Sequence, residues 1–118
     1  MRADGDDFAL EADETKLSSV VWNLLTNARQ AVLEVEARRI QLTLTAKPDA
    51  ISLSIHDSGP GVPESERARL FEPFFSRREG GTGLGLATVH RAVENHGGQI
   101  SVTDGPLGGA RFEVILPR

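Results

Sequence analysis

The sequence predicts an α+β protein, a two-layer α/β sandwich in which the helices cover one face of a mixed, mostly antiparallel sheet. Two long segments repeat hydrophobic residues at helical spacing, and four shorter segments alternate apolar and polar residues as strands do. The strand segments come in two pairs, each joined by turn residues and preceded by a helix, which favours antiparallel hairpins. The expected order is helix, two strands, loop, helix, two strands.

The strongest helix is predicted over residues 14–36. Asp13 precedes it as a candidate N-cap, and its apolar residues recur every three or four positions, as on one face of a helix. These residues are Leu17, Val20, Val21, Leu24, Leu25, Ala28, Ala31, Val32 and Val35. Ahead of this helix, residues 8–12 alternate weakly and fit a short edge strand, while the acidic residues 1–7 are expected to be a flexible leader.

Two antiparallel strands with one buried face are expected after this helix. Residues 40–45 and 51–56 each alternate apolar with polar side chains, and residues 47–49 between them are a turn sequence. Residues 58–83, which follow, hold several glycines, three prolines and many charges, with room for only a short helix near residues 64–70. Because this is too long for a plain connection, we expect a functional loop there.

A second helix is predicted from Gly83 to the glycine pair at 97–98, which stops it. Its apolar residues at helical spacing are Leu84, Leu86, Val89, Ala92 and Val93. Residues 99–102 and 111–116 then read as a closing hairpin around a glycine-rich turn.

The composition is that of one ordinary globular domain covering residues 1–118. The formal net charge of −4 argues against a non-specific nucleic-acid binder or an anionic-membrane binder, since both need a basic surface. The absence of cysteine excludes disulfides, thiolate zinc sites and a cysteine nucleophile. Neither a signal peptide nor a membrane span is predicted, because the apolar runs are short and the first residues are acidic.

Three features point to chemistry, and the first is a row of amides on the helix predicted at 14–36. Asn23, Asn27 and Gln30 fall on successive turns of one side. Amide oxygens suit Mg²⁺, which takes few protein ligands when phosphates supply the rest. Taken alone, the same residues also fit an ordinary polar helix surface.

The second feature is the sequence Asp57-Ser58-Gly59-Pro60-Gly61 directly after a predicted strand. Glycines let the backbone turn sharply and approach a flat ligand, and a carboxylate at the strand end can accept a hydrogen bond from an exocyclic amine. A plain turn with an Asx cap is the alternative reading.

The third feature is the glycine cluster of residues 80–86, which opens the second helix. A glycine-rich loop at a helix N-terminus offers free N–H groups and the positive end of the helix dipole to phosphate. The cluster is neither a Rossmann fingerprint, because no βαβ unit surrounds it, nor a Walker loop, because the Lys-Ser/Thr pair is absent. A flexible hinge is the alternative reading of the cluster.

These features, taken in order with the aromatic segment of residues 70–75 between the last two, resemble the pattern of the GHKL ATPases over nearly the whole chain. Within that superfamily the chain is most similar to the catalytic domains of sensor histidine kinases. The segments that resemble their N box, first glycine box, F box and second glycine box are residues 22–28, 57–61, 71–75 and 81–86, and the ends at His96-Gly97-Gly98 and Leu116-Pro117 also look like that family. The fold implied is the Bergerat sandwich.

The resemblance implies a role for each of these residues. Asn27 would coordinate Mg²⁺ and Asn23 would support the same corner, which makes these two the catalytic candidates, while Asp57 would bind the adenine amine. Gln30 would lie near the phosphates, and Gly59 and Gly61 would let the base approach. The remaining implied nucleotide-binding residues are Arg77 and Arg78 in an ATP lid over residues 62–81, then Gly81, Thr82, Gly83, Leu84, Gly85 and Leu86 around the phosphates. The two arginines fit equally well as solvated charges in a loop with no role in binding.

The implied activity is that of an ATP-dependent protein histidine kinase: the domain would bind Mg-ATP and donate the γ-phosphate to a histidine on a separate dimerisation domain. Asn23 stands where GHKL enzymes that hydrolyse ATP carry a general-base glutamate, and a neutral amide cannot take a proton from water. None of His56, His90 and His96 has the setting of a phosphoacceptor. A non-catalytic nucleotide-binding regulatory module and an anti-sigma-factor serine kinase remain alternatives, the second disfavoured by Asn23.

The implied partners are ATP or ADP, the dimerisation domain of the same kinase and, indirectly, a response regulator. Neither nucleic acid nor direct membrane contact is expected. The domain is expected to be a cytoplasmic monomer within a homodimeric parent, which can itself be membrane-anchored.

Overall fold

The computed structural model describes residues 14–75 and 85–118 of the chain, and these residues form the predicted order of elements. In chain order the elements are α1 (Glu14–Val32), β1 (Ile40–Ala46), β2 (Ala50–Asp57), α2 (Glu64–Arg67), α3 (Gly85–Asn95), β3 (Gln99–Asp104) and β4 (Ala110–Pro117). The predicted edge strand at residues 8–12 and the predicted leader at 1–7 lie outside the described residues.

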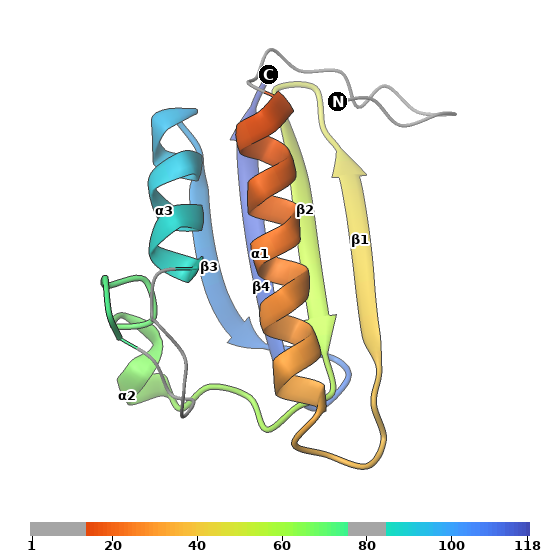
Figure 1. Ribbon diagram of the computed structural model, residues 1–118. Coiled ribbons are helices and arrows are strands. Elements are labelled where there is room, and N and C mark those ends of the chain that lie inside the picture. Colours follow the sequence, from red (N-terminus) through yellow and green to blue (C-terminus); the bar gives the residue numbers. More distant parts are fainter. Residues whose placement is uncertain (1–13, 76–84) are drawn as a thin grey trace.

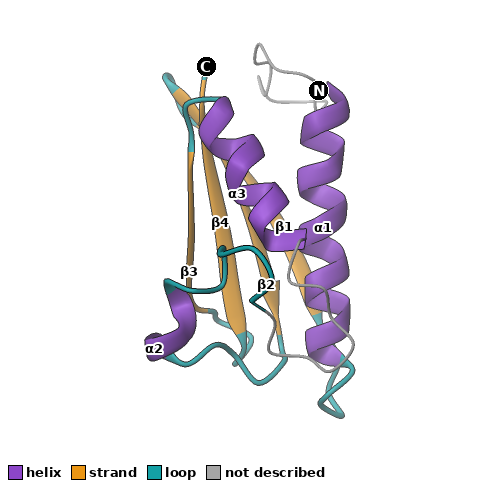
Figure 2. Cartoon of the chain, turned by 60° about the vertical axis from the view of Figure 1, so that its left-hand side comes forward, coloured by secondary structure: helices purple, strands orange, loops and turns teal. Residues whose placement is uncertain are grey.

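The described strands form one four-stranded sheet in the order β1-β2-β4-β3, with every neighbouring pair antiparallel. The helices α1 and α3 lie side by side on one face of this sheet, and no described element covers the other face (Figures 1 and 2). The predicted two-layer α+β sandwich is therefore confirmed. Because β4 is inserted between β2 and β3, the closing hairpin packs beside the strand that ends in Asp57.

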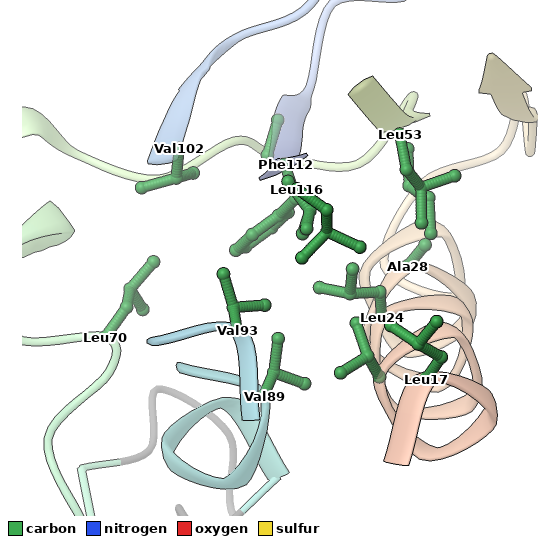
Figure 3. Close-up of a cluster of buried hydrophobic side chains, with 14 residues drawn as sticks. Leu17, Leu24, Ala28, Leu53, Leu70, Val89, Val93, Val102, Phe112 and Leu116 are labelled. Carbon is green, nitrogen blue, oxygen red and sulfur yellow. The ribbon is translucent and has the colours of Figure 1, made fainter. Parts of the chain in front are cut away.

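The core lies between the two helices and the inner face of the sheet (Figure 3). Leu17 and Leu24 project from α1 toward Val89 and Val93 of α3, whereas Ala28 lies beside Leu53 of the sheet. The sheet and loop side chains labelled there are Leu53, Leu70, Val102, Phe112 and Leu116. This packing follows from the apolar periodicity of both helices, since each buries one stripe against the sheet.

The helix α1 ends at Val32, four residues earlier than the predicted end at residue 36. The last turn tightens, because Glu34 and Val35 donate their N–H groups to the carbonyls three residues before them. Arg38 then reaches back and donates to the carbonyl oxygens of Leu33 and Val35 at 3.3 and 3.2 Å. Carbonyls that a longer helix would pair internally are thus satisfied by a side chain, and the chain turns toward β1.

The first hairpin differs from the expectation that one face of each strand is buried. In β1, Ile40, Leu42 and Leu44 remain 41, 43 and 38% exposed, because α1 lies over β2 and β4 and leaves the edge strand uncovered (Figure 1). In β2, the residues from Ile51 to Asp57 are buried on both faces. The alternation of apolar and polar residues predicted both strands correctly but did not distinguish an edge strand from a central one.

The second half of the fold is close to the prediction. The helix α3 ends at Asn95, and Gly97 follows with φ +74°, a conformation that glycine adopts without strain. The strands of the closing hairpin are longer than predicted. The first extends to Asp104 instead of residue 102, and the second runs from Ala110 to Pro117 instead of from residue 111 to 116. Within the described part of the chain, no helix has the length and apolar character needed to span a membrane.

Candidate functional site

Asp57 is the last residue of β2, and its carboxyl group is buried at 1% exposure. The Oδ1 atom accepts hydrogen bonds from the N–H of Gly59 at 2.9 Å and from the N–H of Ala110 at 3.2 Å. The Oδ2 atom is buried and has no hydrogen-bond partner among residues 14–75 and 85–118. A buried carboxylate oxygen without a partner is costly, so this atom is a ready acceptor for a ligand donor.

Close packing around this carboxylate depends on two glycines. A Cβ atom on Gly59 would stand 2.8 Å from the carbonyl oxygen of Ala31 in α1. A Cβ on Gly109 would collide with Oδ1 of Asp57 and would stand 2.7 Å from the nitrogen of Gly59. The close contact at Gly59 is with α1, and its predicted role of letting a base approach stays a prediction.

Gly61, the second glycine of the segment 57–61, has φ +77°, a conformation that glycine adopts without strain. A Cβ on it would lie 3.8 Å from the carbonyl carbon of Gly109, so the turn after β2 lies against the turn between β3 and β4. Ser58 attaches the same turn to the loop after α1, because its Oγ accepts from the N–H of Arg39 at 2.7 Å and donates to the carbonyl of Ala37. The carboxylate of Asp57 is therefore held between three chain segments.

Asn23 lies on the flank of α1 that faces the start of α3. Its Nδ2 donates to the backbone carbonyl of Ser19 at 2.8 Å, which leaves Oδ1 directed elsewhere. A Cβ on Gly85, the first residue of α3, would stand 3.2 Å from that Oδ1. The structure thus brings Asn23 and the N-terminal end of α3 together, as the predicted phosphate corner requires.

The other two amides of the row differ in exposure. Asn27, one turn further along α1, is half-buried, and Gln30 is exposed. From Asn23 beside Gly85 to Ala31 beside Gly59, α1 advances by about 12 Å. A single flank of α1 therefore runs from the predicted phosphate end to the predicted base end, with Asn27 between them.

Most of the atoms that coordinate a metal ion at this site would have to come from a bound nucleotide and water. Among residues 14–75 and 85–118 no group of three or more His, Asp or Glu side chains is placed to hold one. An amide oxygen such as that of Asn27, with phosphate and water supplying the other ligands, suits Mg²⁺. The donor set thus fits a metal that arrives with a nucleotide.

The glycine-rich loop itself cannot be compared with the prediction at most positions. Arg77, Arg78, Gly81, Thr82, Gly83 and Leu84 lie outside the described residues. The described part begins with Gly85 at the start of α3, and Leu86 is partly buried against the hydrophobic core. Gly85 lies beside Asn23 and Leu86 packs against the core, and phosphate binding by either residue stays a prediction.

Part of the predicted lid, from Leu70 to Phe75, contains residues packed against the domain. Leu70 is buried at 6% exposure, and Phe71 stacks on His90 with ring centroids 5.5 Å apart while its edge meets Phe112. Phe75 is partly buried with the guanidinium of Arg69 4.6 Å above its ring. Residues 76–81 of the predicted lid lie outside the described residues.

Phe74 differs from its two aromatic neighbours. Its side chain is 77% exposed, and its φ of +69° falls in the left-handed region that non-glycine residues rarely adopt. The F-box segment thus anchors two phenylalanine rings and leaves the third in solvent.

Two functional residues were missed by sequence reasoning, Gly109 and Ala110. Both hold the carboxylate of Asp57, one by leaving room for it and the other by donating its N–H. The sequence signal was the glycine pair at the end of the predicted turn, which was taken as a hairpin connection only.

Comparisons with known proteins agree with this geometry. The family model described as histidine kinase-, DNA gyrase B-, and HSP90-like ATPase matches residues 12–118. The sensor histidine kinase ZraS of Escherichia coli O157:H7 is 39% identical over 108 residues, which cover 92% of this chain and 23% of that protein. The chain therefore spans about a quarter of the length of this curated relative.

Solved structures give the same picture. The nucleotide-free catalytic domain of histidine kinase ThkA superposes with a TM-score of 0.85 at 34% identity, covering 97% of this chain and 75% of that one. Full-length ShkA, solved in complex with AMPPNP, superposes with a TM-score of 0.75 at 39% identity, covering 90% of this chain and 22% of that one.

Proposed function

Because this chain belongs to the family of histidine kinase-, DNA gyrase B- and HSP90-like ATPases and is the catalytic domain of a sensor histidine kinase, we propose that it binds Mg-ATP and donates the γ-phosphate to a histidine on a separate dimerisation domain. The transfer forms a bond from the acceptor nitrogen to the γ-phosphorus and breaks the bond to the bridging oxygen, which leaves with ADP. The acceptor histidine belongs to a part of the parent kinase outside this chain.

The buried carboxylate of Asp57 is the observation that carries this proposal. Its Oδ1 is occupied by the N–H groups of Gly59 and Ala110, while its Oδ2 is buried without a partner. An ionised carboxylate can only accept hydrogen bonds, so Oδ2 recognises a donor such as the exocyclic amine of adenine. Guanine presents a carbonyl at the corresponding position, and two acceptors facing each other repel.

The phosphates belong at the opposite end of the α1 flank. There Asn23 faces Gly85 at the start of α3, where free N–H groups and the helix dipole favour an anion. In the proposal Asn27 ligates Mg²⁺, which neutralises phosphate charge when bound, and Gln30 lies near the phosphates. The proposal assigns phosphate contacts to Arg77, Arg78 and Gly81 to Leu84, which lie outside the described residues, and to Gly85 and Leu86.

Asn23 also accounts for why the proposed nucleophile is a histidine and not water. Its amide donates to the carbonyl of Ser19 and cannot accept a proton from water. The domain is therefore expected to hold ATP with little hydrolysis until a histidine reaches the γ-phosphate. ShkA, a relative solved with a non-hydrolysable ATP analogue, supports a site of this kind.

The proposal extends to the parent protein. The dimerisation domain is the direct partner, a response regulator receives the phosphoryl group afterwards, and the domain works as a monomeric unit in the cytoplasm of a homodimeric kinase, which can be membrane-anchored.

Two measurements test the proposal. Isothermal titration of the domain with ADP in the presence of Mg²⁺ should give heat, and labelled ATP should phosphorylate the dimerisation domain of the parent when the two are mixed. Absence of heat and of thermal stabilisation at millimolar nucleotide would refute nucleotide binding. Steady ATP hydrolysis by the domain alone that persists in Asn23→Ala would refute the role given to Asn23.

A further inference from the structure

One arginine joins the two turns that enclose the Asp57 carboxylate. Arg67, at the end of α2, donates from Nε to the carbonyl oxygen of Val62 at 3.2 Å and from Nη2 to Oδ1 of Asp104 at 2.8 Å. The two donors lie on one edge of the planar guanidinium, so both acceptors are fixed at a set spacing. The arginine side chain is three-quarters buried, at 25% exposure.

Each of the two acceptors lies beside a residue that contacts the carboxylate region. Val62 directly follows Gly61, the positive-φ residue of the turn after β2. Asp104 is the last residue of β3 and lies opposite Ala110 in the β3–β4 ladder. Ala110 is the residue whose N–H is donated to Oδ1 of Asp57.

The two turns also touch directly at the carboxylate. Gly109 fits between Asp57 and the nitrogen of Gly59 so closely that a Cβ on it would collide with the carboxylate. A small separation of the turns would therefore lengthen the hydrogen bond from Ala110 to Oδ1, the one of the two that crosses between the turns, and let the carboxylate rotate, since such bonds weaken steeply with poor geometry. Arg67 is the described side chain that bridges both turns on the outside of this contact.

We infer that Arg67 is a positioning residue for adenine recognition: by holding Val62 to Asp104 it keeps the two turns together and so keeps Oδ2 of Asp57 directed at the base. The inference rests on the proposed function, because it gives Arg67 the role of orienting the proposed adenine-binding carboxylate of Asp57. Asp104 itself is 85% exposed, so the ion pair contributes little to the free energy of unfolding, and its effect is expected in ligand recognition.

The inference can be tested by NMR titration of the domain with ADP and with adenosine. Arg67→Ala and Asp104→Ala should each weaken both ligands by the same factor, at least threefold, because the defect lies at the base and not at the phosphates. The double variant should lose no more than Arg67→Ala, since Asp104→Ala removes only an interaction that Arg67→Ala already removes. Arg67→Lys keeps the charge but lacks the two-donor edge, so it should fall between the unmodified domain and Arg67→Ala.

Arg91→Ala is the matched control, because it removes one positive charge from an exposed position of α3. It should leave both affinities unchanged. A loss for ADP without a loss for adenosine, or the same loss in the Arg91 variant, would mean that Arg67 acts on the phosphates through its charge, and this would overturn the inference.

A second measurement needs no ligand. The N–H of Ala110 bonds to Oδ1 of Asp57 across the two turns, whereas the N–H of Gly59 bonds to it within one turn. Hydrogen exchange at Ala110 should therefore become faster in Arg67→Ala, while exchange in the β1–β2 ladder stays the same. Unchanged exchange at Ala110 would overturn the inference even if nucleotides bind. Failure of the unmodified domain to bind ADP would instead refute the proposed function, and the exchange result would still decide the role of Arg67.

Discussion

At the scale of single residues, the two oxygens of Asp57 have different tasks. Oδ1 is held by two backbone donors, and Oδ2 is buried and free to accept. Asp57→Asn keeps the size of the side chain but can place a donor where adenine also donates, so ADP affinity should fall by about 1–3 kcal/mol. Isothermal titration measures this loss, and equal binding of ATP and GTP by the unmodified domain would contradict the assignment.

Gly109 is a second residue whose identity should matter. Gly109→Ala places a methyl group against the Asp57 carboxylate and the nitrogen of Gly59, and overpacking of this kind costs on the order of 1–3 kcal/mol of unfolding free energy. ADP affinity should fall as well, because the carboxylate must shift.

The neighbouring glycine is the control for this prediction. A Cβ on Gly108 meets nothing within 4 Å, but the φ there is +92°. Gly108→Ala should lose stability through backbone strain, by roughly 1–3 kcal/mol, and keep its ADP affinity. Chemical denaturation with titration of both variants distinguishes the two effects, and equal ADP affinities would contradict the role of Gly109.

At the scale of elements, α1 has two faces that should respond differently to truncation. Leu24 is 1% exposed in the core beside α3, and Leu24→Ala should cost about 2–5 kcal/mol of unfolding free energy. Trp22, two residues earlier, is 71% exposed, and Trp22→Ala should change stability by no more than about 0.5 kcal/mol. Urea unfolding followed by circular dichroism compares them. Similar losses in both variants would show that the outer face of α1 is packed in solution.

The segment after α2 belongs to the predicted ATP lid, and part of it is packed against the core in the structure. Leu70 lies in the core and Phe71 stacks on His90, so the amides of Leu70 and Glu72 should exchange slowly even without nucleotide. Hydrogen exchange with and without ADP measures this, and rapid exchange at Leu70 in the free domain would instead support a lid that starts near Val62.

At the scale of the whole molecule, one core and one sheet predict a single cooperative transition. A ligand at 100 times its dissociation constant adds about 2.7 kcal/mol, which raises the melting temperature of a domain of this size by roughly 10 °C. Scanning calorimetry with Mg-ADP should show this shift, and Mg-GDP at the same concentration should give a smaller one. Equal shifts would count against base recognition by Asp57, and two separate transitions against a single core.

The sequence by itself determined the elements and supplied the candidate site residues. The apolar periodicity of α1 and α3, the alternation of the strands and the glycines around Asp57 and Gly85 are local patterns, and local patterns depend on neighbours a few positions away. The resemblance to histidine kinases rested on the same short motifs, and the comparisons confirmed it.

Only the tertiary structure decided which elements are covered and which distant residues meet. The exposure of Ile40 and Leu42 follows from β1 being the edge strand, and the bond from Ala110 to Asp57 spans 53 positions because β4 lies beside β2. The bridge from Arg67 to Asp104 likewise joins elements 37 positions apart. Such contacts depend on the order of strands in the sheet, which no periodicity within one segment encodes, because a hydrophobic pattern says that a face is buried without saying against what.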